Sequence, residues 1–320
     1  MSTDIKMFSK KMFILVIMVI ASIAGLLYLS TLIDFDKTNY MRSWVDKVEI
    51  LNSTSSPKIV FVGGSNLAFG LDSPLIEKKF NMPVINMGVH AGIGLRYMLN
   101  KVSESLNKGD VLVIVPEYDC FYTHDRGYGG KALVYILTNF DLAGVKDLPF
   151  ERKLFFLFTA PEYVRTRIYD FLAQFGKSEK IKISVYSRQG FNRNGDNVQH
   201  LDQPQQKIKV FCEGLQKVNM EVVGMLNDYY EDVTKRGIRM VFMYPCLERD
   251  SFRNDISGIS FISKYLSKNL KCEIMSTPDE FVLPKEYFYD TVYHLNRRGV
   301  EIRTQKVIDK LSRVIVKKSL

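Results

Sequence analysis

The chain is poor in the residues that build metal centres and thiol redox motifs. It has four cysteines and four histidines among 320 residues, and no C-x-x-C pair occurs. Cysteine pairs at that spacing hold zinc or exchange disulfides, so neither kind of site has support. No His, Asp and Glu cluster has metal-ligand spacing, and we expect no metal and no cofactor. Outside the cytoplasm, one disulfide could form among the four cysteines, and the alternative is that they are small buried thiols. The four are Cys120, Cys212, Cys246 and Cys272.

Two signatures of nucleotide or nucleic-acid binding are also missing. The net charge is +9, but the basic residues are spread along the chain and form no long stripe. We therefore expect no nucleic-acid partner. Anionic lipid headgroups, an acidic polysaccharide or a solvated basic surface each account for the sign. The glycines at 88–94 lack the G-x-G-x-x-G spacing and the later ribose-binding acid of a dinucleotide site.

A long apolar run near the N-terminus predicts a membrane anchor. Met12–Ile33 contains no charged residue, and a helix of that length crosses a hydrocarbon core. Three lysines precede the run, which predicts a cytoplasmic basic tail over 1–11 and an extracytoplasmic body, periplasmic or at the cell surface. The alternative is a cleaved signal peptide, with small residues at 21–24 as its cleavage site.

Strand-like and helix-like segments alternate over residues 57–320. Apolar, β-branched runs predict parallel strands, at Ile59–Val62, Pro83–Met87, Val111–Val115, Arg239–Tyr244 and Glu273–Ser276. Helical patterns lie between and after them, at Pro74–Phe80, Leu95–Leu106, Gln206–Arg236 and Asn296–Lys317. This alternation predicts an α/β domain with a parallel sheet covered on both faces. Residues 34–56 are expected to be a juxtamembrane helix and polar linker, and residues 125–205 a helical insertion on the substrate side.

The first strand ends in the sequence Gly63-Gly64-Ser65. Open parallel sheets place their chemistry just past the carboxyl ends of their strands. The two glycines allow a sharp turn and leave room above the serine, so Ser65 is a candidate nucleophile. Taken alone, the same tripeptide is also typical of an ordinary tight turn.

Two further strand ends are expected on the same rim of the sheet. His90 follows the second strand, and Glu117 and Tyr118 follow the third, which makes all three candidate substrate-binding residues. For Glu117 the alternative is a salt bridge with Arg96 or Arg126. For His90 the alternative is a hydrogen bond within its own loop.

A base and its orienting carboxylate are available near the C-terminus. Asp290 and His294 lie just before the last predicted helix. A serine nucleophile needs a base, and a histidine base needs a group that fixes its orientation. The alternative role of His294 is to cap the helix that follows.

These segments together resemble the SGNH/GDSL hydrolase superfamily. More narrowly, they are similar to its membrane-anchored, extracytoplasmic members that accompany surface-polysaccharide machinery and its O-acylation. The blocks that carry the resemblance are the serine turn, the oxyanion glycine and the C-terminal acid–base pair, at Gly63–Ser65, Asn86–Gly88 and Asp290–Gly299. The resemblance covers about residues 57–120 and 237–316.

The resemblance implies a flavodoxin-like three-layer α/β/α fold and a serine-dependent site. Ser65 would be the nucleophile, His294 the general base and Asp290 its orienter. The oxyanion hole would be formed by Ser65 and Gly88, with Asn66 able to donate a further hydrogen bond.

The chain departs from the family pattern at two places. Three residues separate Asp290 from His294, where the family usually has two. The asparagine of the third block is not evident, because Pro-Glu-Tyr-Asp occupies 116–119. Glu117, Tyr118 or Asn66 would have to substitute for it.

We therefore expect a serine-dependent O-acyl esterase or O-acyltransferase that acts on a cell-surface carbohydrate through an acyl-enzyme. Its partners would be a carbohydrate or acyl-ester substrate, the membrane and a membrane-bound acyl donor. The alternative is a non-catalytic carbohydrate-binding or scaffold subunit of a polysaccharide modification or export complex. The two departures favour that alternative, whereas the retained Ser, Gly, Asp and His disfavour it.

Overall fold

The computed structural model describes residues 3–31, 37–122, 126–173, 184–210 and 218–315, and its chain divides into two compact units. The larger unit comprises Thr38–Gly130 and Ile183–Leu320, and the smaller comprises Met1–Lys37 and Lys131–Lys182. The larger one carries every strand and is called the α/β unit below.

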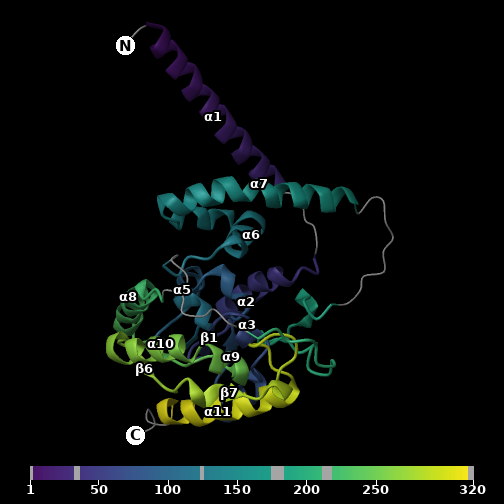
Figure 1. Ribbon diagram of the computed structural model, residues 1–320, viewed down its shortest axis with the longest axis vertical. Coiled ribbons are helices and arrows are strands. Elements are labelled where there is room, and N and C mark those ends of the chain that lie inside the picture. The colour runs from purple at the N-terminus through teal and green to yellow at the C-terminus, as the bar shows by residue number, and fades with distance from the viewer. Residues whose placement is uncertain (1–2, 32–36, 123–125, 174–183, 211–217, 316–320) are drawn as a thin grey trace. The chain divides into compact units, whose positions relative to one another are not determined.

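A five-stranded, fully parallel sheet forms the centre of the α/β unit (Figure 1). The strands lie in the order β2-β1-β3-β4-β6, with bounds Val84–Asn86, Ile59–Gly63, Val111–Val115, Arg239–Phe242 and Glu273–Ile274. Every residue of β1, β2 and β3 is buried, which explains their unbroken apolar sequences. The predicted α/β class with a parallel sheet is confirmed. A separate parallel pair joins β5 (Leu247–Glu248) to β7 (Val282–Leu283).

Helices connect these strands much as the alternation predicts. They are α2 (Ser43–Ser53), α3 (Ser65–Ala68), α4 (Ser73–Phe80), α5 (Leu95–Ser103), α8 (Glu221–Lys235), α9 (Arg249–Asn254), α10 (Ile256–Asn269) and α11 (Arg297–Ile315). Short 3-10 turns also occur, at η1 (Tyr40–Arg42), η2 (Ala91–Ile93), η3 (Tyr118–Phe121), η5 (Arg188–Gly190), η6 (Asp279–Phe281) and η7 (Lys285–Tyr287). The start of α4 shows the local logic, since Asp72 accepts from the Leu75 amide at 3.0 Å and caps the helix.

Two segments differ from expectation. The helix predicted over Gln206–Arg236 begins only at Glu221, and residues 211–217 lie outside the described residues. Ahead of it, the Gln206 amide donates to the Tyr289 carbonyl at 2.7 Å, which holds that segment as extended chain. The segment over 34–56, expected to be a juxtamembrane helix and polar linker, contains the helix α2, and Trp44 and Leu51 of this helix are buried in the α/β unit.

The smaller unit consists of helices: α1 (Thr3–Thr31), α6 (Lys131–Asn139), η4 (Leu142–Asp147) and α7 (Phe150–Ala173). Within α1, Ile5–Tyr28 has a mean hydropathy of 2.3 and is long and apolar enough to span a membrane. Of the expected insertion over 125–205, residues 131–173 form helices of this unit, whereas residues 184–205 belong to the α/β unit. Cys120, Cys246 and Cys272 carry free thiols, and Cys212 lies outside the described residues.

Candidate functional site

Strand register brings Ser65 and Glu117 together. Gly63 at the end of β1 pairs with Val115 at the end of β3, so the residues two positions further on leave the sheet side by side. In the sheet, β2 lies on one side of β1 and β3 lies on the other, so the strand order reverses direction at β1. Parallel sheets have a crevice at the carboxyl ends of the strands where such a reversal occurs. A Cβ on Gly64 would lie 2.5 Å from the Glu117 carboxylate, so glycine is required for this approach.

Asp290 and His294 form the second half of the site. His294 Nδ1 lies 2.8 Å from Asp290 Oδ1, and the carboxylate acceptor assigns the proton to Nδ1. In this tautomer Nε2 carries no proton and can accept one. Tyr186 donates its hydroxyl hydrogen to Asp290 Oδ2 and lies 3.2 Å from His294 Nδ1. Burial opposes ionisation of Asp290, yet the hydrogen bonds from His294 and Tyr186 hold its pKa below the ordinary value.

Phe69 orients the imidazole of His294. The two rings stack with centroids 4.1 Å apart and an interplanar angle of 13°. Phe69 is held in turn by the serine turn, because its amide donates to the Ser65 carbonyl at 2.9 Å. Its own carbonyl accepts from the Leu295 amide at 3.0 Å, so the serine turn and the histidine loop are joined through the backbone.

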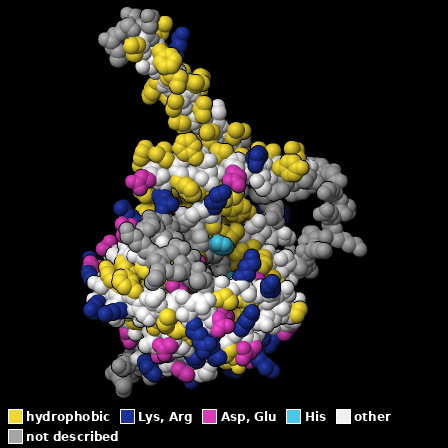
Figure 2. All heavy atoms as spheres, in the orientation of Figure 1, with side chains coloured by type: hydrophobic (Ala, Val, Ile, Leu, Met, Phe, Trp, Pro, Cys, Tyr) yellow, Lys and Arg dark blue, Asp and Glu magenta, His cyan; other side chains and the backbone are white. Residues whose placement is uncertain are grey.

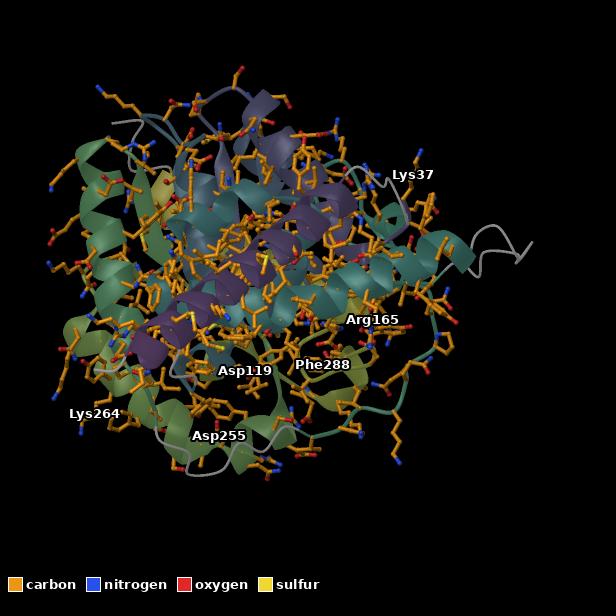
Figure 3. The ribbon with its side chains drawn as sticks, turned by 90° about the horizontal axis from the view of Figure 1, so that it is seen from above. Lys37, Asp119, Arg165, Asp255, Lys264 and Phe288 are labelled. Carbon is orange, nitrogen blue, oxygen red and sulfur yellow. The ribbon has the colours of Figure 1, made fainter. Side chains whose placement is uncertain are left out.

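A cavity of about 680 Å³ joins the two halves. All of its lining residues belong to the α/β unit, and they include Ser65, Glu117 and His294. Its remaining wall comes from the loops after β2 and β3 and from the segments around Tyr40, Tyr186 and Thr291. Asp119, labelled in Figure 3, is another lining residue. This volume is in the range of small-molecule sites.

Ser65 is bonded to Glu117 in this structure. Its Oγ donates to Glu117 Oε1 at 3.1 Å, and the same oxygen accepts the Asn66 amide hydrogen at 2.8 Å. Among the described residues, no hydrogen bond joins Ser65 to His294. Of the two arginines named as alternative partners of Glu117, Arg126 pairs with Glu221 at 3.1 Å and Arg96 donates to the Arg126 carbonyl at 3.2 Å. Glu117 therefore contacts the candidate nucleophile directly.

Asn66 differs from its expected role as an oxyanion donor. It is fully buried, and its side-chain amide donates to the Val115 carbonyl at 3.1 Å. Arg303 of α11 donates to its side-chain oxygen at 2.8 Å and also to its backbone carbonyl. Burial lowers the pKa of Arg303 to about 10, which leaves it a cation at neutral pH. Asn66 thus anchors the serine turn to α11 and does not face the cavity.

Gly88 also differs from expectation. Its N–H donates to the Asn86 side chain at 3.0 Å and is occupied. A Cβ there would lie 2.5 Å from that of Leu67, so glycine lets this loop pack against α3. The Gly88 carbonyl accepts from Lys47, which also donates to the Gly195 carbonyl at 2.7 Å. Burial lowers the pKa of Lys47 to about 7, with Asp196 and Asp46 opposing the shift.

The other two candidate binding residues have different positions. His90 lines the cavity with an exposed side chain, and its Nδ1 accepts the Gly92 amide hydrogen at 3.0 Å. The loop hydrogen bond and the cavity position therefore coexist. Tyr118 is fully buried and does not line the cavity. Its ring stacks on that of Tyr244, with the ring centroids 6.3 Å apart. It is a core residue, which corrects its assignment as a substrate contact.

Sequence reasoning missed four residues that organise the site: Tyr186, Phe69, Lys47 and Arg303. Tyr186 lay within the expected insertion, and Lys47 within the expected linker. The signal that could have identified Lys47 is its helical position, because Trp44 and Leu51, about one turn before and after it, are apolar. Within the described part of the chain, no group of three or more His, Cys, Asp or Glu side chains could hold a metal ion.

Comparison with known proteins adds no name to this site. No protein-family model matches the chain, and no curated protein matches it.

Proposed function

We propose that the cavity of the α/β unit carries out serine-dependent acyl transfer, as an O-acyl esterase or O-acyltransferase acting on a carbohydrate. The observation that carries the proposal is that His294, hydrogen-bonded to Asp290, lines the same cavity as Ser65. Serine acyl transfer requires a nucleophile, a base and a group that orients the base, and these three residues can supply them. The strand order β2-β1-β3-β4-β6 supports a flavodoxin-like arrangement for this unit.

In the proposed reaction, Ser65 Oγ attacks the carbonyl carbon of an acyl ester. Its proton passes to His294 Nε2, and Asp290 stabilises the imidazolium that forms. The ester C–O bond breaks, and the leaving alcohol takes the proton from His294. Water or a sugar hydroxyl then attacks the acyl-enzyme, giving its proton to His294, and Ser65 is regenerated. The Ser65 amide is the remaining expected oxyanion donor, since Gly88 and Asn66 are occupied.

Glu117 defines a resting state for the nucleophile in this mechanism. The Ser65 hydroxyl must leave Glu117 and turn toward His294 before it reacts. A rotation of the Ser65 side chain about its Cα–Cβ bond, from one staggered position to another, would make this change, and such rotations are fast. The substrate would favour the reactive rotamer by filling the cavity.

The cellular setting is part of the proposal. Helix α1 would anchor the chain, and the lysines before it favour an extracytoplasmic α/β unit. A membrane-bound acyl donor and a surface carbohydrate would then both be accessible.

A fluorophosphonate probe tests the catalytic proposal on the full-length protein in detergent. Wild type and Ser267→Ala, an exposed serine on α10, should both gain an adduct that peptide mapping places on Ser65. Ser65→Ala should gain none. A well-folded wild type that never reacts contradicts the enzyme proposal.

One observation favours the non-catalytic alternative. Ser65 donates to Glu117 and two of the three expected oxyanion donors are engaged elsewhere. A chain that binds carbohydrate oligomers in the cavity yet leaves the probe unreacted would be a binding or scaffold subunit. Calorimetric titration with such oligomers, compared between wild type and His90→Ala, distinguishes that outcome.

A further inference from the structure

Helix α7 of the smaller unit has apolar residues on two opposite faces. Its inner face packs on α6, where the Tyr163 ring meets that of Tyr135 edge to face at 5.4 Å. Arg167 reinforces this packing by donating to the Asn139 side chain at 3.3 Å. Phe156 and Ala160 of α7 are buried as well. The helix therefore has a protein partner for one apolar face.

The outer face of α7 exposes a second apolar stripe. Phe158 is 80% exposed and Tyr169 is 72% exposed. Residues spaced by three, four or seven positions share one side of a helix. The stripe is formed by Phe150, Leu154, Phe158, Tyr169 and Leu172, and the exposed, charged Glu162 and Arg165 lie on the same face between Phe158 and Tyr169. Soluble proteins rarely leave large aromatic side chains exposed in a row, so this face is typical of an interaction surface.

The stripe continues onto the apolar surface of α1. Helices α1 and α7 contact each other near the C-terminal end of α1, where Leu26 and Leu27 face Val164, Tyr169 and Leu172 across a groove of about 320 Å³. Seen from above, α1 crosses α7 (Figure 3). Hydrophobic side chains cover α1 and reappear along α7 (Figure 2). Two apolar surfaces of one unit thus meet at the end of the membrane-spanning segment.

Charged side chains lie within and beside the stripe. Arg165, labelled on α7 in Figure 3, lines the groove and is exposed, as is Lys153. Glu162 on the same face pairs with Lys131 at 3.4 Å, so its charge has a partner within the unit. Arginine and lysine at such positions extend their charged ends toward lipid headgroups while their stems stay on apolar surface.

We propose that α7 is an interfacial helix that lies in the outer boundary of the lipid bilayer that α1 spans. Its stripe is buried among the upper acyl chains, about 5–10 Å below the headgroups, and its cations contact phosphates. The inference rests on the proposed anchoring by α1. Because Leu26 and Leu27 lie in the last turns of the span, a helix that touches them is at interface depth. A bilayer is the occupant that continues from α1, whereas a protein partner would have to displace lipid already around that helix.

Depth-dependent quenching by brominated lipids tests this placement on the full-length protein in vesicles. The chain has one tryptophan, Trp44, which is buried, so a Trp44→Phe background allows single probes. The probes are Phe158→Trp in the stripe, Ile17→Trp in the middle of α1 and Phe261→Trp, an exposed aromatic of α10. Bromines near the headgroup end of the acyl chain should remove about half of the Phe158→Trp emission, and bromines at the chain ends should act mainly on Ile17→Trp. Phe261→Trp should keep its emission with both lipids.

The outcomes separate this inference from the anchoring on which it rests. If Ile17→Trp is quenched while Phe158→Trp is not, the span stands and the interfacial helix is wrong. If neither is quenched, the anchoring proposal itself fails. A blue-shifted but unquenched Phe158→Trp places the stripe against protein, which also overturns the lipid assignment.

Discussion

The two sides of the cavity are organised in different ways. On one side, Asp290, His294 and Tyr186 form a complete hydrogen-bonded unit that presents a basic nitrogen to the cavity. On the other side, Ser65 is tied into a buried network through Glu117. The proposed base, His294, is therefore oriented before any substrate binds, whereas the proposed nucleophile, Ser65, is held in a hydrogen bond to Glu117. The contrast teaches that, in the proposed mechanism, reorganisation is confined to one serine hydroxyl.

The largest expected effect comes from removing the nucleophile. Ser65→Ala should lower turnover of a model acetyl ester by at least about 10³-fold, because no acyl-enzyme can form. The free energy of unfolding should change by about 1 kcal/mol or less, since only a half-exposed hydroxyl is lost. Steady-state kinetics and chemical denaturation measure the two quantities. Wild-type turnover in a folded Ser65→Ala sample would remove the serine mechanism.

Asp290→Asn tests the hydrogen-bonded group of Asp290, His294 and Tyr186. The amide no longer fixes the Nδ1–H tautomer of His294, so kcat should fall by about 10²- to 10⁴-fold, less than for Ser65→Ala. Asp202→Asn is the matched control, because Asp202 is an exposed carboxylate that binds Arg297 at 2.7 Å. Equal activities of the two variants would show that Asp290 does not orient a base.

His200 links this side to stability in acid. It is fully buried and its Nε2 lies 2.8 Å from the Leu295 carbonyl, next to His294 in sequence. Burial lowers its pKa from 6.5 to about 4, and the bond to Leu295 opposes that shift. Between these pH values the unfolded chain binds a proton that the folded chain does not. The free energy of unfolding should therefore fall by about 3 kcal/mol as pH drops from 6.5 to 4.

Replacing His200 isolates that contribution. His200→Gln keeps an N–H donor for the Leu295 carbonyl and should flatten the loss of stability across this pH range. Asp290 adds acid sensitivity to both proteins, because its pKa is lowered in the fold and the fold loses stability when this carboxylate is protonated. Denaturation curves at several pH values check the result. An unchanged slope would mean that His200 is already protonated in the fold.

Tyr186→Phe removes the hydrogen bond from Tyr186 to Asp290 and keeps the one between Asp290 and His294. Losing the hydroxyl that donates to Asp290 should raise the Asp290 pKa and shift the acid limb of the kcat profile to higher pH. We expect kcat to fall about tenfold. Tyr289→Phe is the control, a neighbouring tyrosine whose ring lies 5.6 Å from that of His200. A uniform drop with no movement of the acid limb would indicate a packing role alone.

The smallest effect is expected at Glu117. Glu117→Gln keeps a side-chain oxygen to accept from Ser65 and Asn66, so kcat should change by only about two- to fivefold. Comparison with His294→Gln sharpens the contrast between the two sides. Collapse of kcat in Glu117→Gln, with His294→Gln nearly active, would make Glu117 the base and reverse the proposed roles.

Strand ends were predictable from local sequence. The strands β1 and β3 can be recognised as continuous apolar runs, because both faces of the sheet are buried there. A glycine follows the first run and a proline follows the second. This places Ser65 and Glu117 at one rim. Asp290 and His294 are four positions apart, so their contact depends mainly on local chain geometry.

Other assignments failed because neighbours in sequence were mistaken for neighbours in the site. Asn66 follows the nucleophile, yet Arg303, 237 positions away, turns its side chain inward. Tyr118 follows Glu117 but points into the core. Lys47 was not singled out, because the local sequence does not show that it meets the carbonyls of Gly88 and Gly195.

The sequence by itself determined the parallel α/β class, the apolar helix near the N-terminus and the residues that end the strands, since burial and periodicity are encoded locally. Only the tertiary structure decided which partner each polar group takes. Ser65 meets Glu117 because β1 and β3 pair in one register, and Tyr186 meets Asp290 across 104 positions of chain. A buried hydrogen bond requires both partners at one point in space, and residues far apart in sequence are brought to that point only by the packed fold.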